Sequence, residues 1–463
     1  MNYDFIIIGG GSAGYAAART AVALGLKTCV VDGAEELGGL CILRGCMPSK
    51  TLLATSSRAV SVRRAAEFGL RAGKLEVRGD EILARKRRLI DEFAGYRREQ
   101  LERGKFDLVR GFARFVDSET IDVTLRSGGV QRIEGRAFLL ATGSVVSDVP
   151  LPSLKDVGYW TTDEALDSAH VPQSLIILGG GATTVEFATY YAGLGRDVTI
   201  IQRSEQLLKG ADADVADALA HGLRARGVKI FTGTKLHRAE SAGEKKRIVF
   251  EHGGENVSVE AEQIIHALGR SPMVNGLGLD AAGIELTKGR PTMQPTQQTS
   301  QPHIFAAGDV AGPFEIVHIA IQQGEIAARN AARLLAKNGT MEETDYRLKL
   351  SVIFSDPEVA ECGANERELR ASGTAFRVAK YPFNDHGKSL CIGETDGFVK
   401  LIADEHGGEI LGGAVVGPHA SELIHEIVVA MRFRATARQL AEIPHYHPTL
   451  SEIWTYPAEE LAG

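Results

Sequence analysis

The sequence predicts a chain of several α/β domains, with two Rossmann-like nucleotide-binding units followed by a C-terminal α+β domain. Two apolar strands that each lead into a glycine-rich turn, at 6–14 and 176–184, predict the nucleotide-binding units. Short β-type runs at 398–402 and 410–416, followed by the helical stretch 421–433, predict the α+β domain. A length of 463 residues is too great for one hydrophobic core and indicates three or four domains.

The composition excludes several classes of protein. A net charge of −7 over this length argues against a nucleic-acid-binding surface, and we interpret the basic run 85–88 as a solvated helix face. No apolar run approaches the about 18 residues that a membrane span requires. Five cysteines do not form the dense framework of a secreted scaffold, so we expect a cytoplasmic protein. Cys29, Cys362 and Cys391 lie in apolar strand-like stretches and are interpreted as packing residues.

The first glycine-rich turn has the pattern of a dinucleotide site. Gly9, Gly11 and Gly14 follow the strand as GxGxxG. The first glycine allows the tight turn, the second lets a pyrophosphate approach the backbone, and the third allows close helix–strand packing. Asp32 follows the next strand, 28–31, where a carboxylate accepts hydrogen bonds from a ribose. The alternatives are a plain glycine-rich loop and, for Asp32, a turn or capping carboxylate; the order strand, turn, helix, strand favours the nucleotide site.

One close pair of cysteines requires a chemical reason. Cys41 and Cys46 are separated by four residues, and on an ideal helix this offset places the two Cα atoms ~8.6 Å apart. A disulfide tolerates no more than ~7 Å. The pair can therefore close a disulfide only where the helix is distorted, which Gly45 and Pro48 favour. Two unrelated buried thiols, or half of a zinc site, are the alternatives, but neither explains the flanking glycines and the PSK sequence.

From Gly38 the chain reads GGLCILRGCMPSKTLL, which resembles the redox-active segment of the pyridine nucleotide-disulfide oxidoreductases. This family includes dihydrolipoamide dehydrogenase, glutathione reductase and mercuric reductase, and the resemblance covers essentially the whole chain. It implies an FAD-containing homodimer with four domains in each chain. These are an FAD-binding domain at 1–150, an NAD(P)-binding domain at 151–270, a central domain at 271–344 that completes the FAD site, and a dimerisation domain at 345–463.

The resemblance also implies roles for single residues. Cys41 matches the thiol that exchanges with substrate, and Cys46 matches the charge-transfer thiol that faces the flavin. Lys50 matches a lysine near flavin N5, and Glu186 matches its partner glutamate. The alternatives, for each residue taken alone, are a surface lysine for Lys50 and an acid on a helix face for Glu186; their placement together in two motifs favours the family roles.

Two further segments resemble parts of the FAD site. Thr142 and Gly143 belong to an ATG sequence at a strand end. Gly308 and Asp309 belong to an AGD sequence whose aspartate, in the family, binds the ribityl and phosphate region. A strand-end turn is the alternative for each, but their order and spacing favour the FAD site.

The second glycine-rich turn is assigned to a nicotinamide nucleotide through Gly179, Gly181 and, further along the chain, Gly269. Thr184 replaces the third glycine of the pattern, so we expect looser packing between this helix and its strand. A purely structural loop is the alternative.

The end of the following strand predicts which nucleotide binds. An NAD site would place an acid there for the ribose hydroxyls, but the chain has Gln202 followed by Arg203. Arg203 and Lys209 match the basic positions of NADPH-using reductases, where cations form charge-assisted bonds to a 2′-phosphate. We therefore expect NADP(H) to be preferred over NAD(H); the alternative is that both residues are solvated surface cations.

Near the C-terminus the chain reads HYHPTLSE. A thiol attacks a disulfide only as the thiolate, which requires a base that titrates near pH 7, and histidine is that side chain. His447 and Glu452 match the family's acid–base pair, which serves the disulfide of the partner subunit across a dimer interface. A structural histidine is the alternative for His447. His445 and His318 resemble histidines of dihydrolipoamide dehydrogenases, with structural roles as the alternative.

These features predict an FAD-dependent, NAD(P)-linked oxidoreductase that acts on a small dithiol or disulfide and has no metal site. GEIAARN at 324–330 and HYHPTLSE resemble dihydrolipoamide dehydrogenase, whereas Gln202, Arg203 and Lys209 resemble the NADPH-linked reductases. An NADPH-dependent reductase of another small disulfide, similar to glutathione reductase, is therefore the second hypothesis. A mercuric reductase is less favoured because the C-terminal cysteine pair that delivers metal is absent. A flavin-bearing subunit without turnover is also less favoured, because the two cysteines, the lysine and the acid–base pair are all retained.

Overall fold

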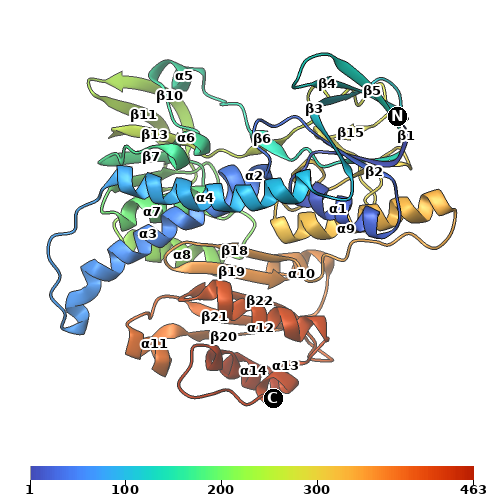
Figure 1. The fold of residues 1–463 in the computed structure, drawn as a ribbon. Helices are drawn as coiled ribbons and strands as arrows, with labels where there is room; N and C mark the ends of the chain where they lie inside the picture. Colours follow the sequence, from blue (N-terminus) through green and yellow to red (C-terminus); the bar gives the residue numbers. More distant parts are fainter. Residues whose placement is uncertain (1) are drawn as a thin grey trace. The chain divides into compact units, whose positions relative to one another are not determined.

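The computed structural model describes residues 2–463, which divide into two compact units (Figure 1). Unit 1 comprises the chain up to Ser49 together with Ala84–Ser147 and Arg270–Asp345; unit 2 comprises Lys50–Leu83, Asp148–Gly269 and Tyr346–Gly463. The breaks after residues 147, 269 and 345 lie close to the predicted boundaries. The division into four domains stays a prediction, because unit 2 groups two of the predicted domains together.

Unit 1 is built on a sheet with β1, Asn2–Ile8, at its centre. Phe5, Ile6 and Ile7 are fully buried, as expected of a parallel strand that is covered on both faces. β1 pairs in parallel with β2 (Thr28–Asp32) and β5 (Val130–Leu140); beyond these lie β3 (Asp107–Phe115) and β17 (Ile304–Ala306), and β4 (Thr120–Leu125) is antiparallel to β3 and β5. The first predicted strand–turn–helix–strand unit is therefore confirmed.

Two helices of unit 1, α1 (Ser12–Ala23) and α9 (Val317–Ala336), lie side by side (Figure 1). Their backbones approach closely, because a Cβ atom added at Gly324 of α9 would lie 2.2 Å from the carbonyl oxygen of Ala13 in α1. Buried alanines from both helices fill the same cluster. Small side chains thus allow α9 to support the start of α1.

The long helix α4, Gly79–Glu102, carries the basic run and corrects one expectation. The three arginines of the run are exposed as predicted, but Lys86 is buried. The helical period places Lys86 on the same side as the buried residues Leu83 and Ile90. The basic run is therefore a solvated face only in part.

The remaining elements of unit 1 are short. They are α2 (Gly39–Arg44), β6 (Ser144–Val146), β14 (Arg270–Pro272), β15 (Leu286–Thr287), β16 (Arg290–Pro291) and the 3-10 turn η2 (Gly308–Val310). Helix α3 (Cys46–Arg64) begins in unit 1 and continues into unit 2, where η1 (Ala65–Phe68) follows it.

Unit 2 contains the second predicted nucleotide-binding fold. Its parallel sheet has the order β13-β7-β8-β9, with strands Gln263–His266, Ser174–Leu178, Asp197–Ile201 and Lys229–Phe231. The same segment contains the four helices α5 (Pro152–Val157), α6 (Thr162–Asp167), α7 (Ala182–Gly193) and α8 (Ala213–Ala225). It also contains an antiparallel sheet of β10 (Lys235–Ala242), β11 (Lys245–His252) and β12 (Glu255–Ala261).

The C-terminal part of unit 2 is an α+β fold, as predicted. Its antiparallel sheet has the order β18-β19-β22-β21-β20, with strands Leu350–Ile353, Glu358–Gly363, Ile410–Gly417, Phe398–Asp404 and Phe376–Pro382. Its helices are α10 (Glu366–Ser372), α11 (Gly387–Ile392), α12 (Ala420–Arg432), α13 (Ala437–Ala441) and α14 (Thr455–Ala462), with the 3-10 turns η3 (Phe383–Asp385) and η4 (Ser451–Trp454).

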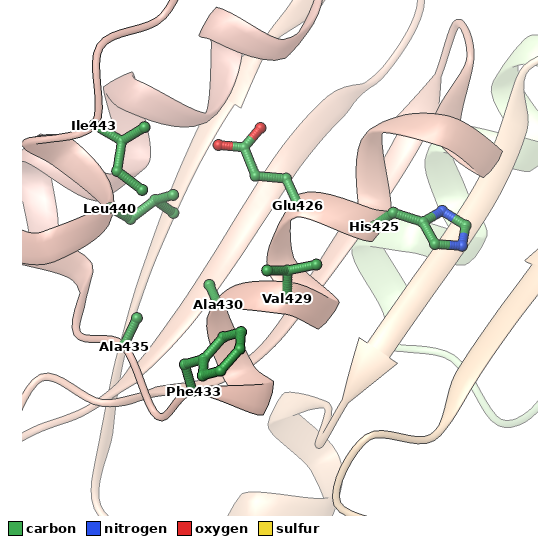
Figure 2. A pocket seen from close by; sticks show the side chains of 8 residues that line it. All are labelled: His425, Glu426, Val429, Ala430, Phe433, Ala435, Leu440 and Ile443. Atoms are coloured by element: carbon green, nitrogen blue, oxygen red, sulfur yellow. The ribbon is translucent and has the colours of Figure 1, made fainter.

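An apolar pocket of about 520 Å³ opens beside α12 (Figure 2). Phe433, which follows the helix, is 80% exposed although it is one of the largest apolar side chains of the chain. The pocket is lined by His425, Glu426, Val429, Ala430, Phe433, Ala435, Leu440 and Ile443. This part of the C-terminal fold therefore presents an apolar surface.

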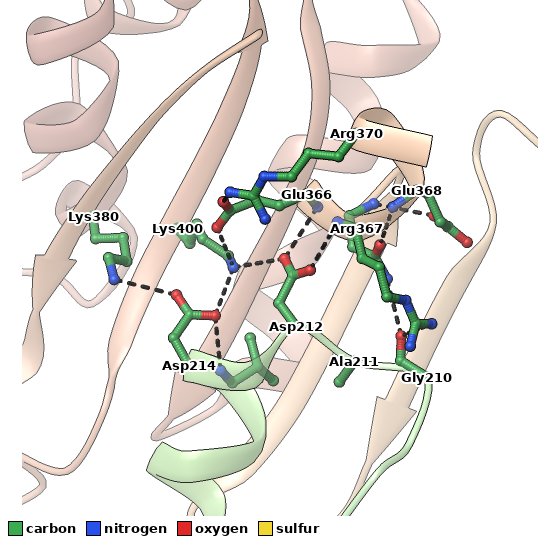
Figure 3. A network of polar contacts seen from close by, with 12 residues as sticks. Gly210, Ala211, Asp212, Asp214, Glu366, Arg367, Glu368, Arg370, Lys380 and Lys400 are labelled. Atoms are coloured by element: carbon green, nitrogen blue, oxygen red, sulfur yellow. Dashed lines mark hydrogen bonds and ion pairs between the residues drawn. The ribbon is translucent and has the colours of Figure 1, made fainter. Parts of the chain in front are cut away.

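A buried lysine joins the start of α8 to the C-terminal sheet within unit 2 (Figure 3). Lys400 of β21 is 1% exposed, and its Nζ lies 2.7 Å from Asp212 Oδ2, 2.8 Å from Asp214 Oδ1 and 3.1 Å from Glu366 Oε1. Within residues 2–463, these three acidic side chains are the one group of potential metal ligands that lie close enough together to hold a cation, and Lys400 pairs with all three. A buried ammonium needs such acceptors, because it is costly to bury a charge without them.

Candidate active site

The first glycine-rich turn requires glycine at two of its three positions. Gly9 has φ of +108°, and a Cβ atom there would lie 2.3 Å from the Ala141 carbonyl oxygen. A Cβ atom at Gly14 would lie 1.8 Å from the Gly9 carbonyl oxygen. At Gly11 the nearest atom to an added Cβ would be Gly39 Cα at 3.9 Å, so space is open above its backbone. The turn has a tight inner side and an open outer side, as a bound pyrophosphate requires.

The start of α1 offers hydrogen-bond donors to this open side. Gly11 is its N-cap residue, and no side chain caps the helix. The first N–H groups of a helix have no intrahelical partner and carry the positive end of its dipole. An anion at this position is therefore stabilised.

Asp32 lies at the end of β2 and contacts the same turn. Its Oδ2 accepts the N–H of Gly10 at 2.8 Å and its Oδ1 accepts the N–H of Ala34 at 2.8 Å. The carboxylate thus holds the turn, which is the structural alternative foreseen for it. Each oxygen keeps a second lone pair, so binding of a ribose stays a prediction.

The ATG and AGD segments meet the first turn inside unit 1. A Cβ atom at Gly308 would lie 3.5 Å from the Cβ of Ala13 in α1. The next residue, Asp309, accepts a hydrogen bond from Ser144 Oγ at 2.6 Å. Thr142 Oγ donates to the Met273 carbonyl oxygen at 2.6 Å, and Gly143 has φ of +74°. Segments far apart in sequence therefore converge near the start of α1.

The cysteine segment is distorted where the sequence predicted it. Helix α2 ends at Arg44, Gly45 has φ of −134° and ψ of −114°, and α3 begins at Cys46. A Cβ atom at Gly45 would lie only 3.3 Å from Cys41 Cα, so the backbone around the second cysteine approaches the first. Both cysteines are partly exposed. Within unit 1 the segment also contacts the nucleotide turn, since a Cβ atom at Gly39 would lie 2.7 Å from Gly11 Cα.

One residue near this segment was missed from the sequence. Arg97 of α4 lies over the ring of Tyr15 at 4.2 Å from its centroid, and its Nε is buried without a hydrogen bond among residues 2–463. Burial lowers the pKa of Arg97, and Tyr15 and Cys41 act in the opposite direction. From the sequence, the helix that contains Arg97 shows only a charged pattern, which does not predict a buried guanidinium at this position.

Lys50 and Glu186 form the predicted pair in unit 2. Lys50 Nζ donates to Glu186 Oε1 at 2.7 Å and to Oε2 at 2.9 Å, and the Glu186 residue is 8% exposed. Phe354, which the sequence did not reveal, completes the arrangement. Its backbone N–H donates to Glu186 Oε1 at 3.2 Å, and its ring lies 4.7 Å from Lys50 Nζ. The carboxylate therefore has three donor contacts, and the ammonium also contacts an aromatic face.

The second glycine-rich turn repeats the first with one change. Gly179 has φ of +123°, and a Cβ atom there would lie 2.3 Å from the Ala267 carbonyl oxygen, whereas an added Cβ at Gly181 would meet nothing within 4 Å. Thr184 takes the place of the third glycine. It is fully buried, and its Oγ makes no hydrogen bond among the described residues. This turn accommodates a side chain where the first has a close contact, in agreement with looser packing. Gly269 follows β13 with φ of +121°.

Gln202 occupies the position that Asp32 has in the first unit. A Cβ atom at Gly180 would lie 2.6 Å from the Gln202 side chain, just as one at Gly10 would lie 2.9 Å from Asp32 Oδ2. Gln202 Oε1 accepts the N–H of Arg203 at 2.9 Å. The acid that binds ribose hydroxyls is thus replaced by an amide.

Arg203 and Lys209 are exposed, and neither side chain forms an ion pair within residues 2–463. The loop that carries them is fixed at its end. Arg367 of α10 donates to the carbonyl oxygen of Lys209 at 2.8 Å. It also donates to the carbonyl oxygen of Gly210 at 2.8 Å (Figure 3). The two side chains are available to an anion, and the backbone of Lys209 is held by the C-terminal fold of the same unit.

His447 and Glu452 are paired as predicted. His447 Nδ1 lies 3.0 Å from Glu452 Oε2; the His447 side chain is 79% exposed, whereas that of Glu452 is nearly buried. The carboxylate sets the tautomer with the proton on Nδ1, which leaves Nε2 available for proton transfer. The sequence missed His386, which lies on the other side of Glu452. No spacing rule connects positions 386 and 452.

The other histidines and cysteines have simpler environments. His445 Nε2 lies 2.6 Å from Glu426 Oε1 beside the pocket of Figure 2, which agrees with the structural alternative, and His318 lies in the first turn of α9. Cys29 and Cys362 are buried, as expected of packing residues. Cys391 is not: it lies in α11 and is exposed. That prediction was wrong because a short apolar stretch fits a helix turn as well as a strand.

Comparison with known proteins finds one family match over most of the chain and a second over its C-terminal part. The family model described as pyridine nucleotide-disulphide oxidoreductase matches residues 3–324, and the model of its dimerisation domain matches residues 350–458. A dihydrolipoyl dehydrogenase of Thermus scotoductus is 36% identical over 466 residues, which cover 99% of this chain and 97% of that protein. One of Bacillus subtilis is 33% identical over 460 residues, which cover 97% and 96%.

Solved structures share the fold. LpdA from Mycobacterium tuberculosis has 30% identity and a TM-score of 0.87, and the match covers 99% of both chains. The flavoprotein disulfide reductase RclA from Escherichia coli has 24% identity and a TM-score of 0.86, which concerns the fold alone. Among the helices of residues 2–463, none combines the length and apolar character that crossing a membrane requires.

Proposed function

This chain belongs to the pyridine nucleotide-disulphide oxidoreductases, and we propose that it is a dihydrolipoyl dehydrogenase-like enzyme that prefers NADPH and works through Cys41 and Cys46. It is an FAD-dependent oxidoreductase that uses a pyridine nucleotide. The nucleotide preference, the physiological disulfide and the roles of single residues are the proposed part.

The residues of unit 1 fit an FAD. The open backbone above Gly11 and the uncapped start of α1 would hold its pyrophosphate, and Asp32 would accept from its ribose. Asp309 would hold the ribityl and phosphate region. A bound FAD would supply the two-electron redox chemistry that links the nicotinamide to the protein disulfide.

The two thiols then carry the exchange. The Cys41 thiolate attacks one sulfur of the substrate disulfide, the substrate S–S bond breaks, and His447 gives a proton to the departing thiolate. The Cys46 thiolate attacks the Cys41 sulfur in turn, which breaks the mixed disulfide, forms the Cys41–Cys46 disulfide and releases the second substrate sulfur as a thiolate that takes its proton from water. Two electrons have moved from the enzyme to the substrate. Oxidation of a dihydrolipoyl group follows the same steps in reverse.

The observation that carries the nucleotide preference is the amide of Gln202 at the position of Asp32, with Arg203 and Lys209 exposed beside it. A 2′-phosphate adds negative charge, which two cations stabilise and a carboxylate would repel. A reductase of another small disulfide is the second candidate, because this same set of residues resembles the NADPH-linked reductases.

Steady-state kinetics test the proposal. We expect kcat/KM to be at least tenfold higher for NADPH than for NADH with lipoamide as the disulfide, and the double change R203A/K209A to remove most of that difference by raising KM for NADPH. Equal kcat/KM values in the unchanged enzyme would disprove the preference. Slow turnover of lipoamide with fast turnover of glutathione disulfide would support the second candidate.

The active site is proposed to be shared by two copies of the chain. The C-terminal segment matches a dimerisation domain, and the apolar pocket with exposed Phe433 lies in that segment. His447 is exposed, as expected of a group that serves a partner's thiols. A cytoplasmic location stays a prediction.

A further inference from the structure

The buried side of Glu452 faces a second imidazole. His386 precedes α11, its side chain is 0% exposed, and its Nε2 lies 3.5 Å from Glu452 Oε1. The other carboxylate oxygen, Oε2, lies 3.0 Å from His447 Nδ1. Glu452 therefore stands between two imidazoles, one buried and one exposed.

The ring of His386 is anchored at its other nitrogen. Nδ1 lies 2.9 Å from Ser389 Oγ, and Ser389 is fully buried. Nε2 makes no hydrogen bond within residues 2–463. Buried polar atoms are rarely left in this state, and an approach of a few tenths of an ångström brings Nε2 within bonding distance of Glu452 Oε1.

Only one tautomer of a neutral His386 suits both neighbours. With the proton on Nε2, the ring presents an N–H to the carboxylate and accepts the hydroxyl proton of Ser389 at Nδ1. The other tautomer would set a nitrogen lone pair against a carboxylate oxygen. Burial lowers the pKa of His386 and the nearby His447 acts in the same direction, whereas Glu452 acts in the opposite one, so burial favours the neutral ring.

The remaining titratable groups nearby leave Glu452 as the charge that faces His386. The ring of Tyr456, from α14, lies 6.4 Å from the His386 ring and stacks on Tyr381 of β20 at 3.8 Å. Asp385, from η3, accepts the Tyr381 hydroxyl at 3.0 Å. Burial and this hydrogen bond raise the pKa of Tyr381 to about 12, so it is uncharged.

We propose that His386 is a positioning residue that donates its Nε2–H to Glu452 Oε1 and thereby holds the carboxylate that orients His447. The site is then a chain of four side chains, Ser389, His386, Glu452 and His447. This proposal rests on the proposed function, because it takes His447 as the acid–base group.

Two donors on one carboxylate have separate effects. They fix the Glu452 side chain, so that Oε2 stays against His447 Nδ1 and the His447 tautomer is maintained. The buried donor also draws negative charge from the carboxylate, which then stabilises the imidazolium form of His447 less. Loss of His386 should therefore impair orientation and move the pH dependence of the reaction toward higher pH.

The test compares H386L with H386Q in the FAD-containing enzyme, through the pH profile of kcat/KM for the disulfide. Leucine fills the buried space without a donor, whereas the glutamine amide reaches toward Glu452. We expect H386L to lower kcat about tenfold at pH 7, with KM for the nucleotide unchanged, and to move the inflection of the kcat/KM pH profile upward by about half a pH unit. H386Q should stay within about threefold of the unchanged enzyme in rate and keep its inflection.

Two further variants separate the possible failures. S389A leaves His386 in place but removes the hydroxyl that fixes its tautomer, so a smaller shift in the same direction is expected even where H386L folds poorly. L390A alters an exposed neighbour on α11 and should change nothing. A pH profile unaltered in both H386L and S389A overturns the positioning role. If instead H447Q retains full activity and the same profile, the proposed function itself fails.

Discussion

The carbonyl oxygen of Gly9 lies where a side chain at position 14 would begin, and this single atom decides what the first turn tolerates. The second turn accepts Thr184 at the equivalent position. The first turn therefore excludes a side chain at its third glycine position, whereas the second turn accepts one. A backbone contact, and not the number of glycines, makes this difference.

G14A should abolish FAD binding. The added methyl group would lie 1.8 Å from the Gly9 oxygen, so the turn must move away from the start of α1, where the pyrophosphate is expected. We expect the purified variant to lack most of its flavin absorbance relative to protein. G95A is the matched control, because a methyl group at Gly95 in α4 meets nothing within 4 Å. Normal flavin content in G14A would place the cofactor elsewhere.

Residues joined by a recognisable sequence pattern were predictable, and their partners from other segments were not. The pairs Lys50–Glu186 and His447–Glu452 were expected and are observed at 2.7 Å and 3.0 Å. Arg97, Phe354 and His386 were missed. Each belongs to a segment without a recognisable sequence motif, and it reaches its site only through the folding of the chain.

At the scale of elements, helix propensity and the cysteine spacing together predicted a break that the structure contains. Gly45 ends α2 and Cys46 starts α3, whereas an uninterrupted helix would hold the two cysteines too far apart for a disulfide. Short apolar stretches were less informative. The stretch around Cys391 forms a helix of six residues, Gly387–Ile392, rather than a strand.

The strand β19 contains an acid whose titration should affect stability. Burial, together with the charge of Asp212, raises the pKa of Glu361 to about 7, although Lys400 acts in the opposite direction. The folded protein then binds a proton more tightly than the unfolded chain, whose glutamate has a pKa of about 4.3. The contribution of Glu361 to stability is therefore complete at low pH and falls as the pH rises from about 4.3 to 7.

E361Q should remove this dependence. We expect the free energy of unfolding at pH 8 to exceed that of the unchanged protein by about 4 kcal/mol, with the difference vanishing near pH 4. Urea unfolding at both pH values measures it. E244Q, at an exposed turn position, is the control and should have no effect at either pH. A stabilisation by E361Q that is independent of pH would contradict a raised pKa.

At the scale of the whole molecule, the order of segments along the chain was predictable and their grouping was not. The boundaries near 150, 270 and 344 were expected from the family resemblance, and the two glycine-rich turns and the change to short β-type runs beyond about residue 345 agree with that order. That segments 148–269 and 346–463 form one unit depends on contacts such as those of Lys400, Arg367 and Asp212. Charged residues of this kind follow no periodic pattern, so the sequence does not predict which distant residues they pair with.

A shared active site predicts complementation between two inactive chains. Co-expressed and differently tagged C41S and H447Q chains should give a mixed dimer with about half the activity of the unchanged enzyme, because one of its two sites has both Cys41 and His447. Each variant alone should be nearly inactive. The matched control pairs an unchanged chain with a C41S/H447Q chain, which leaves one defect in each shared site and should give little activity. Activity in the control but not in the first mixture would mean that each chain contains its own complete site.

The hydrogen bonds from Arg367 to the backbone of Lys209 and Gly210 have an entropic consequence. Asn365 adds a third bond to the same loop, from its side-chain amide to the Gly210 carbonyl oxygen at 3.1 Å. A loop that is already ordered by its own chain loses little conformational freedom when a ligand arrives. Whichever dinucleotide binds there, the entropic cost of ordering the loop is small, so the contact of the ligand with Lys209 contributes more to the binding affinity.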